Sequence, residues 1–168
     1  SEFLRSGMEP NHLIFLAVLS SCSHNGMVQH GLETFYSMVR DFGVEPSHEH
    51  LACVVDLLCR AKRVEEAFKF YKENFTKPSI DVLGIILDAC RANGETEVED
   101  VVCRDMIDLK PVDAGHYVRL AHSFAAMRRW EDVSESWKQM KSLGLKKLPG
   151  WSKIEMNGRT TTFFMSHS

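Results

Sequence analysis

The sequence predicts an all-α fold, an α-solenoid of four helix–turn–helix pairs followed by a short hairpin or irregular tail. Three observations lead to this class. Prolines recur at a nearly constant interval, turn-forming residues recur between them at the same interval, and the apolar residues of each interval have helical spacing. With 168 residues, 44% of them hydrophobic, the chain is long enough to bury one continuous core.

Two independent sets of markers give the repeat period. The prolines are spaced by 36, 32 and 33 residues, and the turn markers by 36, 32 and 34. Nine residues beyond each turn marker stands a bulky or thiol side chain, and twelve residues beyond it stands a Met in three cases of four. The markers are Pro10, Pro46, Pro78 and Pro111 for the first set, and Gly26, Lys62, Gly94 and Arg128 for the second. A period of about 34 is typical of stacked helical pairs, which bury their apolar faces against their neighbours.

Each repeat contains two helices because apolar residues recur three and four positions apart, as in Leu51, Val54, Val55 and Leu58. Asn-Gly at 25–26 and 93–94, Gly43 and Gly144 supply residues that tolerate a left-handed backbone at helix ends. We expect first helices at 12–24, 48–61, 80–92 and 114–127, and second helices at 28–42, 64–75, 95–109 and 130–143.

The last twenty or so residues depart from the repeat. Leu148-Pro149-Gly150 ends the helical spacing, and the segments 151–156 and 159–164 are rich in β-prone residues. Between them stands Asn157-Gly158, which favours a type I′ hairpin turn. We therefore expect a small hairpin that packs on the last helices or on a partner.

Composition excludes several classes of function. The net charge of −3 does not attract a polyanion, so this chain is not expected to bind nucleic acid strongly by itself. No apolar run approaches the ~20 residues of a membrane span, so we expect no membrane contact. The five cysteines are odd in number and form no C-x-x-C, which indicates buried reduced thiols rather than disulfides or zinc. No cofactor is expected.

Catalytic motifs are absent from the sequence. A zinc deaminase needs His-x-Glu and Pro-Cys-x-x-Cys, and neither occurs. His48-Glu49-His50 places its histidines on different faces of a helix, and we interpret it as a solvated helix start. The carboxylate groups Glu65-Glu66 and Glu97-Glu99-Asp100 are expected on charged helix surfaces. These observations predict a chain that is not an enzyme.

Several segments resemble plant pentatricopeptide repeat proteins of the PLS subclass. The segments 18–26, 53–58 and 64–67 are similar to the last L and S motifs of that subclass. Leu87-Asp88-Ala89-Cys90-Arg91 resembles a first E motif, segments 114–118 and 129–133 resemble a second, and 149–155 resembles the start of an E-plus segment. The tetratricopeptide pattern of Trp, Leu-Gly and Tyr in the first helix is met by none of the four pairs.

The resemblance implies a division of the chain and a function. Residues 1–11 would be vector-derived or the end of a preceding repeat. An L-type repeat (12–47), an S-type repeat (48–79), two E motifs (80–113 and 114–147) and a truncated E-plus segment (148–168) would follow in a right-handed solenoid. Upstream repeats of an imported mitochondrial or chloroplast protein would select an organellar RNA site for cytidine-to-uridine editing. The E region would recruit a DYW-type deaminase or a MORF-like editing protein.

The resemblance also implies where RNA bases would be contacted, at the fifth and last residues of each repeat. The corresponding pairs are Leu16 with Ser47, Ala52 with Ser79, Gly84 with Asp113, and Val118 with Lys147. None of the fifth residues has a side-chain hydrogen-bonding group, so base recognition here is expected to be weak.

The C-terminal end offers the stronger candidate surface. Aromatic and apolar residues are concentrated there, and such residues dominate protein–protein contacts. The candidate partner-binding residues are Pro149, Gly150, Trp151, Ile154, Phe163 and Phe164, whereas Trp130 and Trp137 are expected to face the preceding helix. A lysine cluster near 138–153 either guides an acidic partner or reflects helix C-termini. Three alternatives remain: an RNA-stabilising end cap, a tetratricopeptide-like peptide scaffold, and self-association through an exposed solenoid end.

Overall fold

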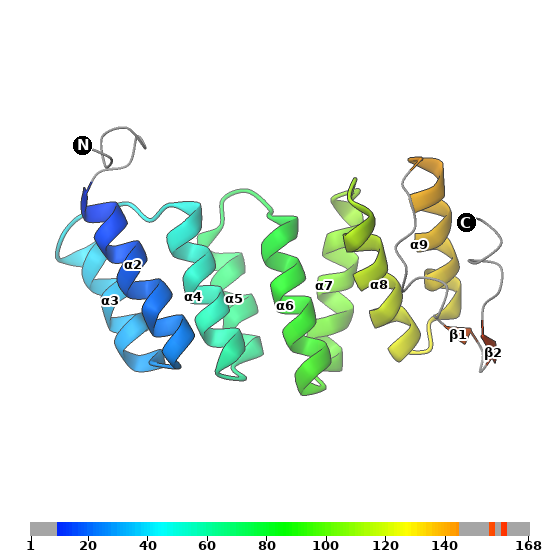
Figure 1. Ribbon diagram of the computed structural model, residues 1–168, viewed down its shortest axis with the longest axis horizontal. Helices are drawn as coiled ribbons and strands as arrows, with labels where there is room; N and C mark the ends of the chain where they lie inside the picture. The colour runs from blue at the N-terminus through cyan, green and yellow to red at the C-terminus, as the bar shows by residue number, and fades with distance from the viewer. Residues whose placement is uncertain (1–9, 145–154, 157–158, 161–168) are drawn as a thin grey trace. The chain divides into compact units, whose positions relative to one another are not determined.

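The computed structural model describes residues 10–144, 155–156 and 159–160, and within them the chain forms helical pairs and one small hairpin (Figure 1). The helices lie within two residues of the expected ranges. They are α2 (Pro10–Asn25), α3 (Val28–Arg40), α4 (His48–Arg60), α5 (Val64–Asn74), α6 (Ile80–Asn93), α7 (Thr96–Asp108), α8 (Ala114–Ala126) and α9 (Trp130–Ser142). The strands are β1 (Glu155–Met156) and β2 (Arg159–Thr160).

The chain divides into two compact units, residues 1–89 and 90–168, and α6 spans the boundary between them. In the first unit α2 packs on α3 and α4, and α4 packs on α5, so that α2 and α4 form one layer with α3 and α5 behind it (Figure 1). In the second unit α8 packs on α7 and α9. The expected helical repeat is therefore confirmed in both units.

The turn inside each pair has the same backbone geometry in all four cases. The four turn markers have a positive φ: 69° for Gly26, 64° for Lys62, 69° for Gly94 and 59° for Arg128. The backbone N–H of the following residue donates to the carbonyl five positions earlier in every pair, over 2.8–3.0 Å, as in Met27 to Cys22 and Arg129 to Phe124. This bond closes the end of each first helix in a Schellman motif, so the residues chosen as repeat markers are those with the left-handed backbone.

Lys62 and Arg128 occupy a backbone conformation that disfavours a side chain. Replacing either residue with glycine is expected to raise the free energy of unfolding by about 0.5–1 kcal/mol, because relief of the left-handed strain exceeds glycine's added unfolded-state entropy. Urea denaturation followed by circular dichroism measures the change. Lys69→Gly, at an exposed position inside α5, is the control and is expected to cost about 1 kcal/mol. Equal destabilisation by all three variants would contradict the prediction.

The core uses two fixed positions of each second helix. Nine residues beyond the turn markers, Phe35, Tyr71, Cys103 and Trp137 are all buried. Twelve residues beyond the turn markers, Met38, Met106 and Met140 have no exposed surface. The position at which Met recurs in the sequence is therefore a buried position of the second helix. The equivalent Asn74 is half-buried, and its Nδ2 donates to the carbonyl of Phe70 over 2.9 Å. Three Met side chains thus fill the same place in their pairs.

Gly31 permits the close approach of three helices in the first unit. A Cβ at this position of α3 would overlap Cδ2 of Leu57 on α4 and would lie 3.2 Å from Cβ of Cys22 on α2. Leu57 and Cys22 are themselves buried, so neither has free space to move into. The sequence markers gave no indication of this contact.

The C-terminal hairpin forms where it was expected. Glu155 pairs with Thr160 and Met156 with Arg159 in an antiparallel ladder. The Asn157-Gly158 turn and the six candidate partner-binding residues, Pro149, Gly150, Trp151, Ile154, Phe163 and Phe164, lie outside the described residues. Their proposed role stays a prediction.

The described helices differ in how much apolar surface they expose at the two ends of the repeat series. The first pair exposes five large apolar side chains: Ile14, Met27, Tyr36, Val39 and Phe42. In the described part of the last pair, only Leu143 is an exposed large apolar residue, and Trp137 is buried as expected.

Candidate binding surfaces

The fifth residues of the four repeats, which the sequence analysis associated with RNA bases, have no side-chain group that could hydrogen-bond to a base. Leu16 on α2, Ala52 on α4 and Val118 on α8 are half-buried, and Gly84 on α6 is buried. Their side chains contain only carbon and hydrogen, so none donates or accepts a hydrogen bond. The structure thus places the predicted positions on the first helices without supplying a chemistry that distinguishes base edges.

The residues at the last positions cap helices. The Oγ of Ser47 accepts from the backbone N–H of His50, the Oγ of Ser79 accepts from that of Val82, and Oδ1 of Asp113 accepts from that of Gly115 over 2.8 Å. A capping side chain satisfies backbone donors that the helix leaves unpaired. These three oxygens thus have a structural role at the starts of α4, α6 and α8.

The first helices of the first unit present an acidic surface. Their residues 10–25, 48–60 and 80–89 contain four carboxylates and a single arginine. Asp56 accepts from the Oγ of Ser23 over 2.5 Å and from Nε of Arg60 over 3.0 Å. Such a surface repels a phosphate backbone, in agreement with the negative net charge.

His50 is a correction to the sequence analysis. The segment His48-Glu49-His50 was interpreted as a solvated helix start, yet His50 has no exposed surface. Its Nε2 donates to the carbonyl of His12 over 2.7 Å, and its Nδ1 accepts from the backbone N–H of Ser47 over 3.0 Å. Through these partners the ring joins the start of α2 to the start of α4. His48 is exposed, as expected.

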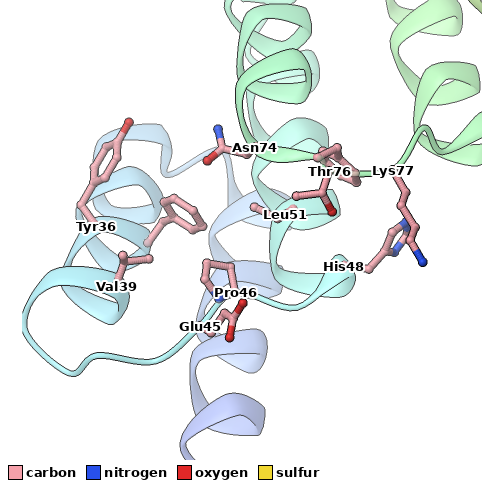
Figure 2. Close-up of a pocket in the computed structure, with 11 residues that line it drawn as sticks. Tyr36, Val39, Glu45, Pro46, His48, Leu51, Asn74, Thr76 and Lys77 are labelled. Atoms are coloured by element: carbon pink, nitrogen blue, oxygen red, sulfur yellow. The ribbon is translucent and has the colours of Figure 1, made fainter.

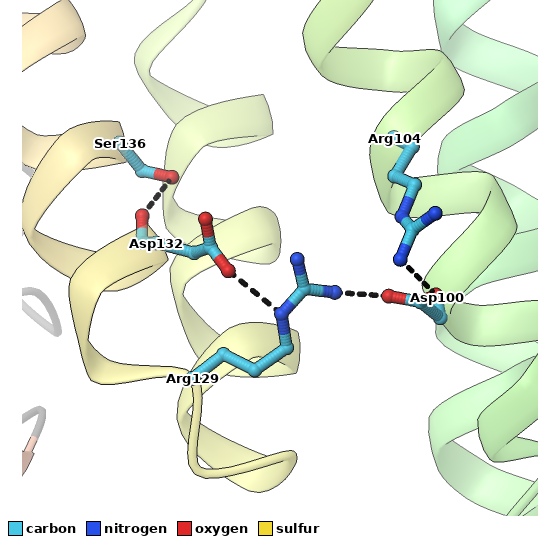
Figure 3. A network of polar contacts seen from close by, with 5 residues as sticks. All are labelled: Asp100, Arg104, Arg129, Asp132 and Ser136. Atoms are coloured by element: carbon cyan, nitrogen blue, oxygen red, sulfur yellow. Dashed lines mark hydrogen bonds and ion pairs between the residues drawn. The ribbon is translucent and has the colours of Figure 1, made fainter.

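A network of charged side chains joins α7 to the turn before α9 in the second unit (Figure 3). Arg129 contacts Asp100 through Nη1, and its Nε donates to Oδ2 of Asp132 over 2.7 Å. Arg104 forms a second ion pair with Asp100 at 2.9 Å. The Arg129 guanidinium also lies 5.1 Å from the ring centroid of Phe124. This one arginine, about one-third exposed, therefore contacts α7, α8 and α9.

The acidic segment of α7 is a second correction. Glu97 lies at the surface as expected, but Glu99 is only 3% exposed and Asp100 is half-buried in the network above. The Oε2 atom of Glu99 has no hydrogen-bond partner among the described residues. Helical phase explains the error: Glu99 shares a face with buried Val102, Cys103 and Met106.

The cysteines are free thiols, and four of the five are buried, while Cys53 is half-buried. Burial, with the nearby Asp56 carboxylate, raises the pKa of Cys59 to about 12. Burial and Glu99 raise the pKa of Cys103 to about 12 as well. Because only the thiolate is a good nucleophile or metal ligand, these side chains serve as packing groups.

No group of His, Cys, Asp and Glu side chains in the described part of the chain is arranged to hold a metal ion. No helix within residues 10–144 has the length and apolar character needed to cross a membrane.

Comparison with known proteins places two kinds of motif along the chain. The profile described as PPR repeat matches residues 14–41 and 52–73, and the profile described as E motif matches residues 94–155. The two repeat matches fall in the first compact unit and the E-motif match falls in the second. Neither profile describes an enzyme.

Curated relatives come from Arabidopsis thaliana. Pentatricopeptide repeat-containing protein At4g04370 is 85% identical over all 168 residues, which cover 23% of its own length. Pentatricopeptide repeat-containing protein CRR2, chloroplastic, is 39% identical over 96% of this chain and 25% of its own length. The chain thus spans about a quarter of the length of these relatives.

A solved structure supports the fold. The pentatricopeptide repeat protein PPR10, in complex with an 18-nt psaJ RNA element, superposes with a TM-score of 0.66 at 21% identity, over 91% of this chain and 23% of that one. At this level of identity the similarity supports the helical repeat architecture alone.

Proposed function

Because the chain belongs to the pentatricopeptide repeat proteins that carry an E motif, we propose that it is a non-catalytic module of an organellar RNA editing factor. In this proposal its E-motif unit recruits a DYW-type cytidine deaminase or another editing protein, and other repeats of the full-length protein select the transcript. The mitochondrion or the chloroplast is the proposed location. One relative at 39% identity carries the word chloroplastic in its name.

The observation that carries this proposal is that the two kinds of motif match fall in different compact units of the structure. The E-motif match, 94–155, lies within a compact unit of its own, whereas both repeat matches lie in the other. A separately packed unit is suited to a role separate from base recognition. The missing hydrogen-bonding groups at the fifth positions and the acidic first-helix surface add support, because they leave these repeats poorly equipped to bind RNA.

Binding to a purified DYW-type deaminase domain tests the proposal. Isothermal titration calorimetry is expected to show a complex with the 168-residue chain and a loss of binding when residues 149–168 are deleted. Circular dichroism of the shortened chain checks that the helices remain. Retention of full binding after the deletion would contradict the assignment of Trp151, Ile154, Phe163 and Phe164 as contacts. Failure of the complete chain to bind would contradict recruitment itself.

An RNA-stabilising end cap is the second candidate function. The last pair supports it in one respect: among its described residues Leu143 alone exposes a large apolar side chain, which suits a pair at the end of a repeat series. Fluorescence anisotropy with a short single-stranded RNA distinguishes the two functions. We expect no sequence-dependent micromolar binding by this chain, and such binding would favour the second function.

A further inference from the structure

A groove in the first unit lies between the C-terminal ends of its two second helices (Figure 2). Its volume is about 560 Å³, within the range of ligand-binding clefts. Tyr36 and Val39 form the α3 side and Phe75 forms the α5 side, with buried Leu51 at the floor. The groove includes neither the first-helix positions associated with bases nor any residue of the E-motif match.

The walls of the groove expose apolar surface. Tyr36 is 51% exposed and Val39 is 42% exposed, although both stand beside the buried ring of Phe35. Phe35 packs edge-on against Phe70 at 5.3 Å between centroids, which fixes the spacing of the two walls. The packing of these two rings therefore sets the separation of the groove's two walls.

Two opposite charges border the groove. Glu45 belongs to the connection before α4, and Lys77 belongs to the connection before α6 (Figure 2). Within the described residues neither side chain forms an ion pair or a hydrogen bond. A ligand that carries one positive and one negative group would pair with both of them.

The local field disfavours a nucleic acid. Helices α3 and α5 both end at the groove, and helix C-termini carry partial negative charge. Glu45 adds a full negative charge to the groove. Lys77 can pair with one phosphate group, but the adjoining phosphates of a nucleic acid would meet this negative field. A polypeptide brings charges of both signs and apolar side chains, which matches the lining.

The same place in the repeat is hollow in the second unit. Ile107 and Tyr117, the repeat equivalents of Val39 and Leu51, border a smaller cavity of about 360 Å³ at the ends of α7 and α9. This cavity is lined by Asp108, Lys110 and Gln139 together with Ile107, Tyr117 and Leu143. The hollow is thus a consequence of helix-pair stacking, and the first unit has the larger one.

We propose that the α3–α5 groove binds a linear peptide segment of a partner protein. The segment inserts a large aliphatic or aromatic side chain between Val39 and Phe75, with a basic residue toward Glu45 and an acidic residue toward Lys77. The opposite charges set the direction of the peptide. This inference is independent of the proposed recruitment through the E-motif unit.

A random 12-residue peptide library displayed on phage and panned on the 168-residue chain tests the proposal. The expected consensus is a large apolar residue flanked by one basic and one acidic residue. A synthetic consensus peptide is then titrated by fluorescence anisotropy. Val39→Asp is expected to weaken its binding at least tenfold, as is common for a central contact. Val101→Asp, at a 39% exposed position of α7, is the matched control and should leave affinity unchanged.

Exchanging the charges of Glu45 and Lys77 tests the direction in which the peptide binds. The double variant Glu45→Lys with Lys77→Glu is expected to prefer the peptide in which the two flanking charges are exchanged.

A labelled 12-nucleotide single-stranded RNA serves as the competing probe. The proposal is overturned if panning yields no consensus, if Val39→Asp and Val101→Asp bind the peptide alike, or if the RNA binds and Val39→Asp abolishes that binding. Circular dichroism of each variant confirms folding, and deaminase binding by Val39→Asp keeps this test separate from recruitment.

Discussion

Replacing His50 with alanine is expected to lower the free energy of unfolding by about 3 kcal/mol. The change removes a fully buried ring and leaves the carbonyl of His12 and the backbone N–H of Ser47 without their partners. A cavity and two unsatisfied polar groups both add to the loss. Because the ring joins α2 to α4, we expect the loosening to be greatest between the first two pairs.

Urea denaturation followed by circular dichroism measures this loss. Hydrogen exchange of the amides at the start of α4 then locates it. His24→Ala is the control, because His24 is exposed and its Nδ1 contacts only the carbonyl of Ser20 in the preceding turn. It is expected to change stability by less than about 0.5 kcal/mol. Equal effects of the two variants would mean that the buried bonds of His50 contribute nothing particular.

Replacing Arg129 with alanine is expected to cost about 2 kcal/mol, less than a fully buried ion pair because the side chain is one-third exposed. The variant leaves half-buried Asp100 with Arg104 alone and removes the contact of the guanidinium with Phe124. It also removes the bond to Asp132 at the start of α9. We therefore expect the last pair to separate from α7 at a lower denaturant concentration.

Arg104→Ala is the matched control for Arg129. Its side chain is 66% exposed and forms one ion pair within the same helix, so a loss of no more than about 0.5 kcal/mol is expected. A double-mutant cycle with Asp100→Asn isolates the Arg129–Asp100 coupling, which high salt should reduce. If Arg104→Ala costs as much as Arg129→Ala, the connection between helices is not what stabilises this unit.

The adjacent residues Arg128 and Arg129 show how much the chemistry of one residue type depends on its place. Arg128 has a left-handed backbone, so its replacement by glycine is expected to stabilise the chain. Arg129 begins the next helix and holds two carboxylates, so its removal is expected to destabilise it. The period of the turn markers predicted a turn at Arg128, whereas nothing in the local sequence indicated the contact of Arg129 with Asp100.

The sequence by itself determined the helical pairs, their ends and their period. These features depend on neighbours in the chain: apolar spacing of three and four residues, capping residues, and turn residues that tolerate a positive φ. It also determined which side chain of each second helix enters the core, since Phe35, Tyr71, Cys103 and Trp137 recur at one phase.

Only the tertiary structure decided which polar residues are buried and what they contact. His50 has sequence neighbours typical of an exposed helix start, yet it is buried and bonded to His12 on α2, which the local pattern does not specify. The burial of Glu99, by contrast, follows from its helical phase with Val102, Cys103 and Met106. The groove between α3 and α5 likewise depends on how far two walls are held apart by Phe35 and Phe70. Contacts between residues thirty or more positions apart depend on the stacking of pairs, and local periodicity contains no information about the partner across that gap.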